Sequence, residues 1–379
     1  MMDQPTRAFR LSDRQRLQWL RLIRTENVGP ATFRDLINRY GSAGAALEAL
    51  PELAARGGAR KPPRIPHETE VERELEAAQG AGAIVSAIGE ADYPAMLKTM
   101  PAPPPVIMFR GDPAVFGHPA CAIVGARNAS LSGMKMARML ARDLAAQGHV
   151  TVSGLARGID TAAHEGALEG GTVAVLAGGL SHPYPPENVP LMEAIVAHGG
   201  AVVSEMPFHW QPRAQDFPRR NRLIAGLAFG LVVVEAALRS GSLISARLAG
   251  EMGRAVFAVP GSPLDPRAGG SNSLLKNGAS VVTEAGDIIS HLAPMTGNQR
   301  DLFAGACDLE EQEDLMPAPP PGDDERTRVI QALGPSPVHV DEVIRHTGLK
   351  PAQVQLVLIE LDLAGRLERH AGNQVSILL

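Results

Sequence analysis

Two loops in the middle third of the chain carry residue types that bind phosphate well. Arg127 follows the apolar run 121–124 and precedes a helix-like segment that begins near Ser130, and Ser-Gly-Ser at 240–242 opens another such segment. A guanidinium group binds phosphate through parallel N–H donors, and the free amides of a helix N-terminus attract anions. We therefore predict phosphate contacts at both loops. A structural salt bridge is the alternative for Arg127.

The densest basic cluster lies at 219–222, where three of four residues are arginine and the other is Asn221. A charge run is usually just a solvated face. This one follows Pro218 and precedes an apolar segment, 223–229, that predicts a helix. The arginines would then lie just before a helix N-terminus, where anions bind.

The spacing of glycines and possible ligands argues against a cofactor. A dinucleotide fingerprint requires glycine at positions 127 and 130, which hold arginine and serine, and the next strand closes on Ser153-Gly154 without a carboxylate for a ribose. Asp160 and His164 would share a helical face, but no third metal ligand is in register. A helix cap at Asp160 and packing of the two side chains are both preferred to a metal site. We expect neither NAD nor a metal.

Composition limits the possible partners. The 379 residues carry a formal net charge of -5, so affinity for an anionic polymer must come from a local patch. Lysine is scarce, and arginine supplies most of the positive charge. Cys121 and Cys307 lie in unlike contexts and support neither a disulfide framework nor a zinc site. The sequence shows no signal segment and no long apolar span, which predicts a cytoplasmic protein without membrane contact.

The elements that must position these loops are short apolar runs rich in Val, Ala and Ile, each ending at Gly, Ser or Pro. Amphipathic helical segments separate them, a pattern typical of a doubly wound, mostly parallel α/β sheet. In such folds ligands bind outside the carboxyl ends of the strands. The candidate loops stand at those ends.

The flanking segments predict smaller modules. Leu17 to Leu53 reads as a helical unit interrupted at Asn27-Val28-Gly29-Pro30. That turn could present amides to phosphate as helix-hairpin-helix modules do, although an ordinary turn is the favoured reading. The tail has three short helical patterns and then a two-stranded wing, as in a winged helix. Its nearly balanced charge favours protein docking or regulation over DNA reading.

The predicted boundaries are a helical domain at 1–56, a linker at 57–70, a Rossmann-like domain at 71–293, an acidic Pro-rich linker at 294–324, and a winged-helix domain at 325–379.

The ordered motifs of the main domain resemble those of the bacterial DNA-processing protein A family, also called Smf. The resemblance runs from about Asp92 to Glu284. It rests on Asp-Tyr-Pro, Val-Gly-Ala-Arg, Ser-Gly-Leu-Ala-Arg-Gly-Ile-Asp-Thr-Ala-Ala-His, Tyr-Pro-Pro-Glu-Asn, Phe-Pro-Arg-Arg-Asn-Arg-Leu-Ile-Ala-Gly-Leu, Glu-Ala followed by Ser-Gly-Ser-Leu-Ile, and Val-Pro-Gly. Each motif is weak alone, but all of them in this order are specific.

The resemblance implies an extended Rossmann-like domain that dimerises and binds single-stranded DNA in a basic pocket. It also implies loading of the RecA recombinase during natural transformation. By resemblance Arg127 is the arginine of that pocket. The family pocket also uses a lysine, and this chain has none between Lys135 and Lys276. The partner cation would therefore be one of Arg157, Arg219, Arg220, Arg222 and Lys276.

The complete set of predicted DNA- or phosphate-binding residues is Gly125, Arg127, Ser130, Ser153, Gly154, Arg157, Gly158, Arg219, Arg220, Asn221, Arg222, Ser240, Gly241, Ser242, Asn272 and Lys276. The candidates for base stacking are Tyr184, Phe208, Trp210 and Phe217. For Tyr184 the equal alternative is an anchor at the domain edge, and for the other three the alternative is core packing.

Two other classes of function compete with a DNA-binding mediator. Related Rossmann-like phosphoribohydrolases carry Pro-Gly-Gly-x-Gly-Thr-x-x-Glu at the loop that here reads Arg239 to Ser245, so Ser245 stands where their catalytic glutamate would be. We therefore expect no enzyme activity and assign no catalytic residue. The third class is a protein scaffold, whose DNA binding, if any, would survive loss of Arg127.

Overall fold

The computed structural model describes residues 10–296, 309, 311, 320–370 and 372–378. It divides into a central unit, 74–308, and a terminal unit formed by 1–73 together with 309–379. Each unit is described below by itself.

The central unit is built on a nine-stranded sheet with the order β1-β2-β6-β5-β4-β3-β7-β8-β9. Strands β1 and β2 pair antiparallel, as do β2 and β6, and the other pairs are parallel. The strands are β1 Ile84–Ala87, β2 Val106–Gly111, β3 Ala120–Val124, β4 Val150–Ser153, β5 Thr172–Val175, β6 Ala201–Ser204, β7 Gly230–Val233, β8 Ala255–Ala258 and β9 Ser280–Val281.

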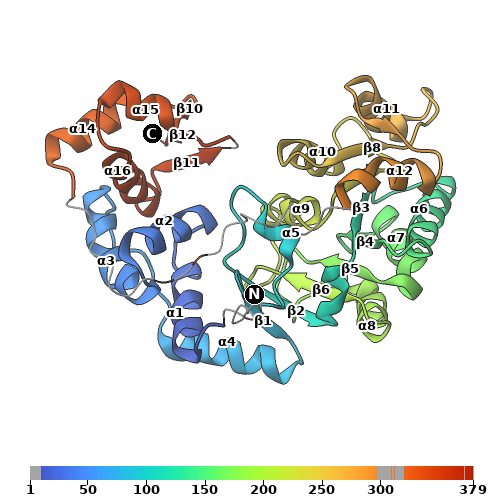
Figure 1. The fold of residues 1–379 in the computed structure, drawn as a ribbon, viewed down its shortest axis with the longest axis horizontal. Helices are drawn as coiled ribbons and strands as arrows, with labels where there is room; N and C mark the ends of the chain where they lie inside the picture. The colour runs from blue at the N-terminus through green and yellow to red at the C-terminus, as the bar shows by residue number, and fades with distance from the viewer. Residues whose placement is uncertain (1–9, 297–308, 310, 312–319, 371, 379) are drawn as a thin grey trace, which may run out of the picture. The chain divides into compact units, whose positions relative to one another are not determined.

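Helices flank the sheet and bury its two faces. Figure 1 shows α6 and α7 on one side of the central strands and α9 on the other. One core cluster joins Ile123 of β3 and Phe257 of β8 to Leu140 of α6. The helices are α4 Glu68–Gly80, α5 Ala95–Lys98, α6 Leu131–Ala145, α7 Ile159–Ala167, α8 Val189–Ala197, α9 Asp216–Gly226, α10 Ser242–Glu251, α11 Gly269–Lys276 and α12 Ala285–Thr296.

The strand order reverses at β3. The chain runs from β3 outward through β4, β5 and β6, and then returns to the other side of β3 with β7, β8 and β9. The loops that follow β3 and β7 therefore turn away from each other at the carboxyl edge. Such a switch point leaves a crevice in doubly wound sheets. The predicted α/β fold is confirmed.

The terminal unit combines a helical segment with a winged helix, as predicted. A three-stranded sheet of order β10-β12-β11 forms the wing, one short strand more than the sequence indicates. The elements are α1 Asp13–Ile23, α2 Pro30–Tyr40, α3 Ala43–Arg56, α14 Asp323–Ala332, β10 Val338–His339, α15 Val340–Thr347, α16 Pro351–Leu363, β11 Leu367–His370 and β12 Gln374–Ile377.

Helix α16 packs against α2 and α3 within this unit. The Thr32 hydroxyl donates to the Asp362 carboxylate, and Asn27 Nδ2 donates to the carbonyl oxygen of Leu363 at 3.1 Å. Arg369 pairs with Asp35 at 3.2 Å. A helix that is apolar on all sides is normally buried, and α16 has buried residues around its whole circumference. It is therefore a docking element inside the terminal unit.

Replacing Gly57 with alanine is expected to loosen this docking. A Cβ atom at Gly57 would lie 1.9 Å from the carbonyl oxygen of Glu360 in α16, so the helices must separate. We expect a loss of about 1–3 kcal/mol, typical of overpacking. Urea unfolding followed by Trp19 fluorescence, with Trp210 replaced by phenylalanine, measures it.

Gly80→Ala is the control for that substitution, because a Cβ atom there meets nothing within 4 Å. The control should keep the urea midpoint of the parent protein. An unchanged midpoint for Gly57→Ala would show that α16 is not held against α3 in solution.

Candidate phosphate-binding crevice

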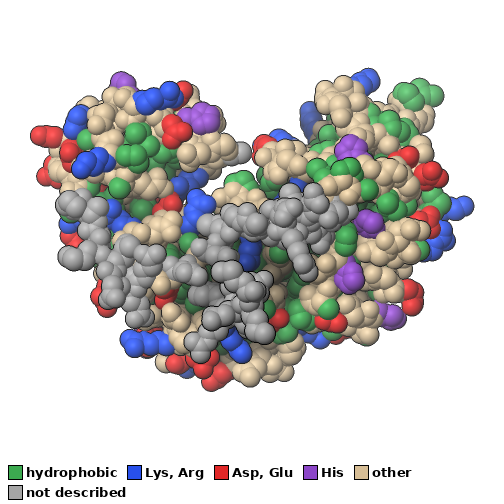
Figure 2. Space-filling view, in the orientation of Figure 1, with side chains coloured by type: hydrophobic (Ala, Val, Ile, Leu, Met, Phe, Trp, Pro, Cys, Tyr) green, Lys and Arg blue, Asp and Glu red, His purple; other side chains and the backbone are tan. Residues whose placement is uncertain are grey.

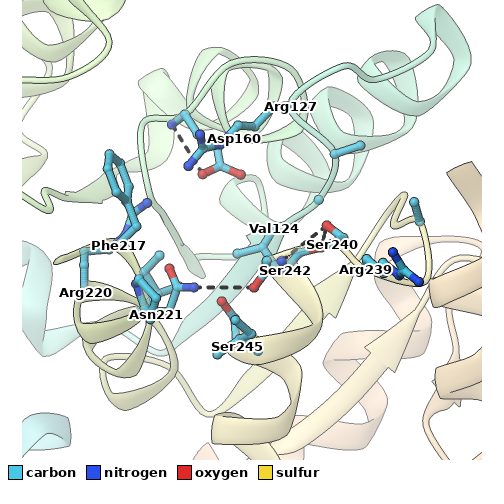
Figure 3. Close-up of a pocket in the computed structure, with 18 of the residues that line it drawn as sticks. Val124, Arg127, Asp160, Phe217, Arg220, Asn221, Arg239, Ser240, Ser242 and Ser245 are labelled. Carbon is cyan, nitrogen blue, oxygen red and sulfur yellow. Dashed lines mark hydrogen bonds between the residues drawn. The ribbon is translucent and has the colours of Figure 1, made fainter. Parts of the chain in front are cut away.

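A crevice of about 480 Å³ opens at the switch point, where β3 and β7 end. Three segments contribute most of its wall: the loop after β3, the first two turns of α9, and the loop that leads from β7 into α10. Figure 3 shows these side chains around one hollow. The lining residues are Val124, Gly125, Ala126, Arg127, Asn128, Ala156, Asp160, Phe217, Pro218, Arg220, Asn221, Ile224, Ala237, Arg239, Ser240, Gly241, Ser242, Ile244, Ser245 and Arg267.

Arg127 presents an uncommitted guanidinium group to this crevice. Its Cζ atom lies 5.1 Å from the ring centroid of Phe217, a cation–π contact. It forms no hydrogen bond or ion pair with any residue that the structure describes. The structural salt bridge that was the alternative to phosphate binding by Arg127 is therefore not seen among the described residues. The group is free to bind an anion.

The N-terminus of α10 forms the opposite wall. The Ser240 and Ser242 hydroxyl oxygens lie 2.7 Å apart, and Asn221 Nδ2 is 3.4 Å from the carbonyl oxygen of Gly241. The amides of Ser242, Leu243 and Ile244 already donate to Ser240 Oγ at 3.3 Å and to the carbonyl oxygens of Ser240 and Gly241 at 3.1 Å, so the free amides predicted here are not seen. The N-terminus of α10 still contributes its hydroxyls and a partial positive charge to the hollow that Arg127 lines. This arrangement suits a phosphate group.

Two further arginines, Arg239 and Arg267, line the crevice, although neither was predicted from the sequence as a binding residue. Arg239 directly precedes the Ser-Gly-Ser loop and is exposed, and it has no hydrogen-bond or ion-pair partner among the described residues. Arg267 pairs with Asp265 at 2.9 Å. The adjacency of Arg239 to Ser240 was a signal in the sequence. Arg267 is 26 residues beyond Gly241, and no local pattern connects it to the site.

The basic cluster at 219–222 does not act as one patch, because α9 begins at Asp216, earlier than the predicted helix at 223–229. Successive residues of a helix point in different directions. Arg219 pairs with Glu205 at 3.0 Å, and the Arg222 guanidinium also pairs with Glu205. These two cations share one carboxylate, which offsets only one of their two positive charges, and neither of them lines the crevice. Of this run only Arg220 and Asn221 line it.

Arg220 is buried in the crevice wall, with 6% of its surface exposed. Its guanidinium donates to the carbonyl oxygens of Gly154 and Val175, the second at 2.7 Å. Burial lowers the pKa of Arg220 to about 10, while Asp160 raises it and Arg127 lowers it. The group stays protonated at pH 7. Its contacts tie the ends of β4 and β5 together, which is a structural role.

The loop after β4 is held by two buried side chains. Asp160 accepts hydrogen bonds from the amides of Gly154 at 3.1 Å and Ala156 at 3.3 Å. Helix α7 has Gly158 as its N-cap, so the prediction that Asp160 is the cap residue is wrong. The amide of Leu155 donates to His164 Nε2 at 3.3 Å. The described residues contain no group of three potential metal ligands.

Lowering the pH is expected to destabilise the central unit through His164. Burial, with a smaller effect of Arg220, lowers the pKa of His164 from 6.5 to about 3. The unfolded chain therefore takes up this proton first. The stabilisation is complete above pH 6.5 and is lost as the pH falls toward 3, about 2 kcal/mol of it by pH 5.

The measurement is urea unfolding at pH 7 and pH 5, followed by Trp210 fluorescence with Trp19 replaced by phenylalanine. His164→Gln, which does not titrate, should lose correspondingly less stability over this interval. Equal losses in both proteins would place the titrating group elsewhere.

Several predicted residues lie outside the crevice and have other partners. The Ser130 hydroxyl contacts Glu235 and caps α6, while Ser153 Oγ donates to the carbonyl oxygen of Ile123 at 2.6 Å. Arg157 pairs with Glu187. Asn272 Nδ2 donates to the carbonyl oxygen of Gly261 at 2.9 Å. Gly154, Gly158 and Lys276 are also absent from the lining.

The aromatic candidates divide in the same way. Phe217 lines the crevice, and the Tyr184 ring meets it edge-on at 5.7 Å between centroids. Phe208 is buried, and Trp210 Nε1 donates to Asp216 at 2.9 Å. Core packing, the alternative for Phe208, Trp210 and Phe217, describes Phe208. Tyr184 and Phe217 stay candidates for base stacking.

The fold and the crevice define an extended Rossmann-like α/β protein with a cationic cavity at its switch point. The chain belongs to the DNA recombination-mediator protein A family, whose model matches residues 84–293. Models of the DprA-like N-terminal HHH domain and the DprA winged helix domain match 13–77 and 313–373. The resemblance found in the sequence is confirmed.

Similar proteins come from several bacteria. Protein Smf of Escherichia coli K12 is 37% identical over 288 residues, 75% of each chain, and DNA processing protein DprA of Bacillus subtilis 168 is 41% identical over 208 residues, 54% of this chain and 70% of that one. The crystal structure of Streptococcus pneumoniae DprA is 32% identical with a TM-score of 0.57, covering 73% of this chain and 92% of that one.

The Helicobacter pylori DNA processing protein A, which binds single-stranded DNA, is 30% identical with a TM-score of 0.51. That match covers 56% of this chain and 97% of the other. Among the described residues, no helix is both long and apolar enough to cross a bilayer.

Proposed function

We propose that this protein binds single-stranded DNA through the crevice and acts as a recombination mediator that protects the strand and helps to load RecA during DNA uptake. The observation that carries the proposal is the convergence of Arg127, Arg239 and the N-terminus of α10 on one cavity. The whole chain has a net charge of -5, so this cavity concentrates positive charge locally. The H. pylori relative that binds single-stranded DNA supports the choice of ligand.

In this proposal the protein binds DNA without catalysing a reaction on it. It acts in the cytoplasm as a homodimer. Ser245 lines the crevice at the position where the related phosphoribohydrolases carry a glutamate, and a serine hydroxyl cannot replace that acid. Phe217 and Tyr184 at the edge of the cavity would stack on bases without selecting a sequence.

The test is fluorescence anisotropy of a labelled single-stranded 20-mer with the full-length protein, using the corresponding duplex as competitor. We expect the single strand to bind more tightly. Two or three phosphate contacts should cost roughly tenfold in affinity when salt rises from about 50 to 200 mM. A duplex that competes as well as the single strand, or binding independent of salt, would contradict the proposal. Adding RecA to the preformed complex then tests loading, measured as faster filament formation.

A further inference from the structure

Ser245 lines the crevice, and its hydroxyl has no partner among the described residues. It is 2% exposed, against 8% for Ser242, and none of the described residues forms a hydrogen bond with its Oγ atom. It lies three positions beyond Ser242, so both residues share a face of α10. In Figure 3 its oxygen points toward the side chain of Asn221, another lining residue. Its Oγ atom is not among the described side-chain atoms that are both sealed from solvent and unpaired, so the hydroxyl can be reached from the crevice and is available to an acceptor atom of a ligand.

Positive charge exceeds negative charge around this hydroxyl. Arg127 and Arg239 have no partner among the described residues, and the α10 amides add a partial positive charge. Asp160 is the one carboxylate among the described lining residues, and it is buried beside Arg220, which offsets its charge. The crevice therefore suits a ligand group with more than one negative charge.

We propose that the crevice holds a terminal phosphate in preference to a phosphodiester within a strand. A terminal phosphate is a phosphomonoester attached to one nucleotide only, either at the end of a strand or in a free nucleotide. This inference rests on the proposed function and makes its ligand more specific. A phosphomonoester carries about -1.5 to -2 charges at pH 7 and offers three acceptor oxygens. These match the two guanidinium groups, the partial positive charge of the α10 N-terminus and the Ser245 hydroxyl.

Shape supports the same choice. A phosphodiester is esterified to two nucleosides, so the strand must extend out of the cavity in two directions. A phosphomonoester is esterified to one nucleoside, so the strand extends out in one direction only. Ser245 is so deeply buried that only the tip of a ligand can reach its hydroxyl. The volume of about 480 Å³ is in the range of small-molecule sites rather than of a long groove.

The experiment compares single-stranded 20-mers of one sequence that carry a 5′-phosphate, a 3′-phosphate or neither, and a circular strand of similar length. We expect one phosphorylated end to raise affinity roughly tenfold, the effect of one charge-assisted contact. The preference should shrink as the pH falls below about 6, where the monoester loses its second charge. Competition by free 5′-dTMP, with thymidine as control, tests which molecule supplies the phosphomonoester. Strong competition by 5′-dTMP indicates a free nucleotide, and weak competition indicates a strand end.

Ser245→Ala and Arg239→Ala should each bring the ratio of affinities for phosphorylated and unphosphorylated strands closer to one. Ser290→Ala, an exposed serine of α12 outside the crevice, is the control and should keep the ratio of the wild type.

Equal affinity for circular and end-phosphorylated strands would overturn the inference and leave the proposed function standing. Absence of binding to every strand would overturn both. Preference for a phosphorylated end that Ser245→Ala and Arg239→Ala leave intact would place the end in another site and also overturn the inference.

Discussion

Replacing Arg127 with alanine is expected to weaken the binding of single-stranded DNA by roughly 10- to 100-fold at low salt. The guanidinium group lines the crevice and has no partner among the described residues, so its removal leaves a phosphate without its charge-assisted donors. The slope of log K against log salt should become less steep by about 0.7, the effect of one phosphate contact. Anisotropy titrations at several salt concentrations measure both quantities.

Arg138→Ala provides the matched control. Arg138 lies on α6, is exposed and pairs with Glu165, so its loss removes the same charge outside the crevice. We expect less than a twofold change in affinity, since an exposed ion pair contributes little. If Arg127→Ala and Arg138→Ala bound single-stranded DNA equally well, the DNA would bind elsewhere on the chain. That result would support the hypothesis that the protein is a scaffold.

Replacing Arg220 with methionine is expected to reduce the stability of the central unit by about 3–5 kcal/mol. The substitution leaves Asp160 buried without its nearby positive charge, and it leaves the carbonyl oxygens of Gly154 and Val175 without this donor. Methionine keeps much of the volume, so the loss reports the polar contacts. Urea unfolding followed by Trp210 fluorescence, in a Trp19→Phe background, measures it.

Arg219→Met is the control for Arg220, because it lies one position earlier on α9 and has a partly exposed ion pair. Its stability should change by less than about 1 kcal/mol. An Arg220→Met protein of normal stability that had lost DNA binding would assign Arg220 to the phosphate directly and refute its structural role.

The main features of the fold could be predicted from local patterns. Short apolar runs punctuated by Gly, Ser and Pro predict strands, and the helical segments between them require a parallel sheet. The same local reasoning placed Arg127 and Ser240 to Ser242 at strand ends, and the structure brings both into one crevice. The residues that directly follow a parallel strand lie at the carboxyl edge of the sheet, and this placement does not depend on contacts with distant segments.

The helix at 216–226 shows where local reasoning failed. The arginines were treated as residues before a helix, and they lie within α9. Side chains on a helix diverge by about 100° per residue, so neighbours in sequence face different partners. Arg220 turns into the wall, and Asn221 alone of the remaining three lines the cavity.

By itself, therefore, the sequence determined the fold class, the family and the two loops of the crevice, because each depends on residues that are close in the chain. Only the tertiary structure decided which charges are free. Glu205 pairs with both Arg219 and Arg222, Asp160 offsets Arg220, and Arg267 reaches the crevice from a distant turn. A charge is neutralised by what lies within a few ångströms in space, and those neighbours come from segments that a linear pattern does not connect.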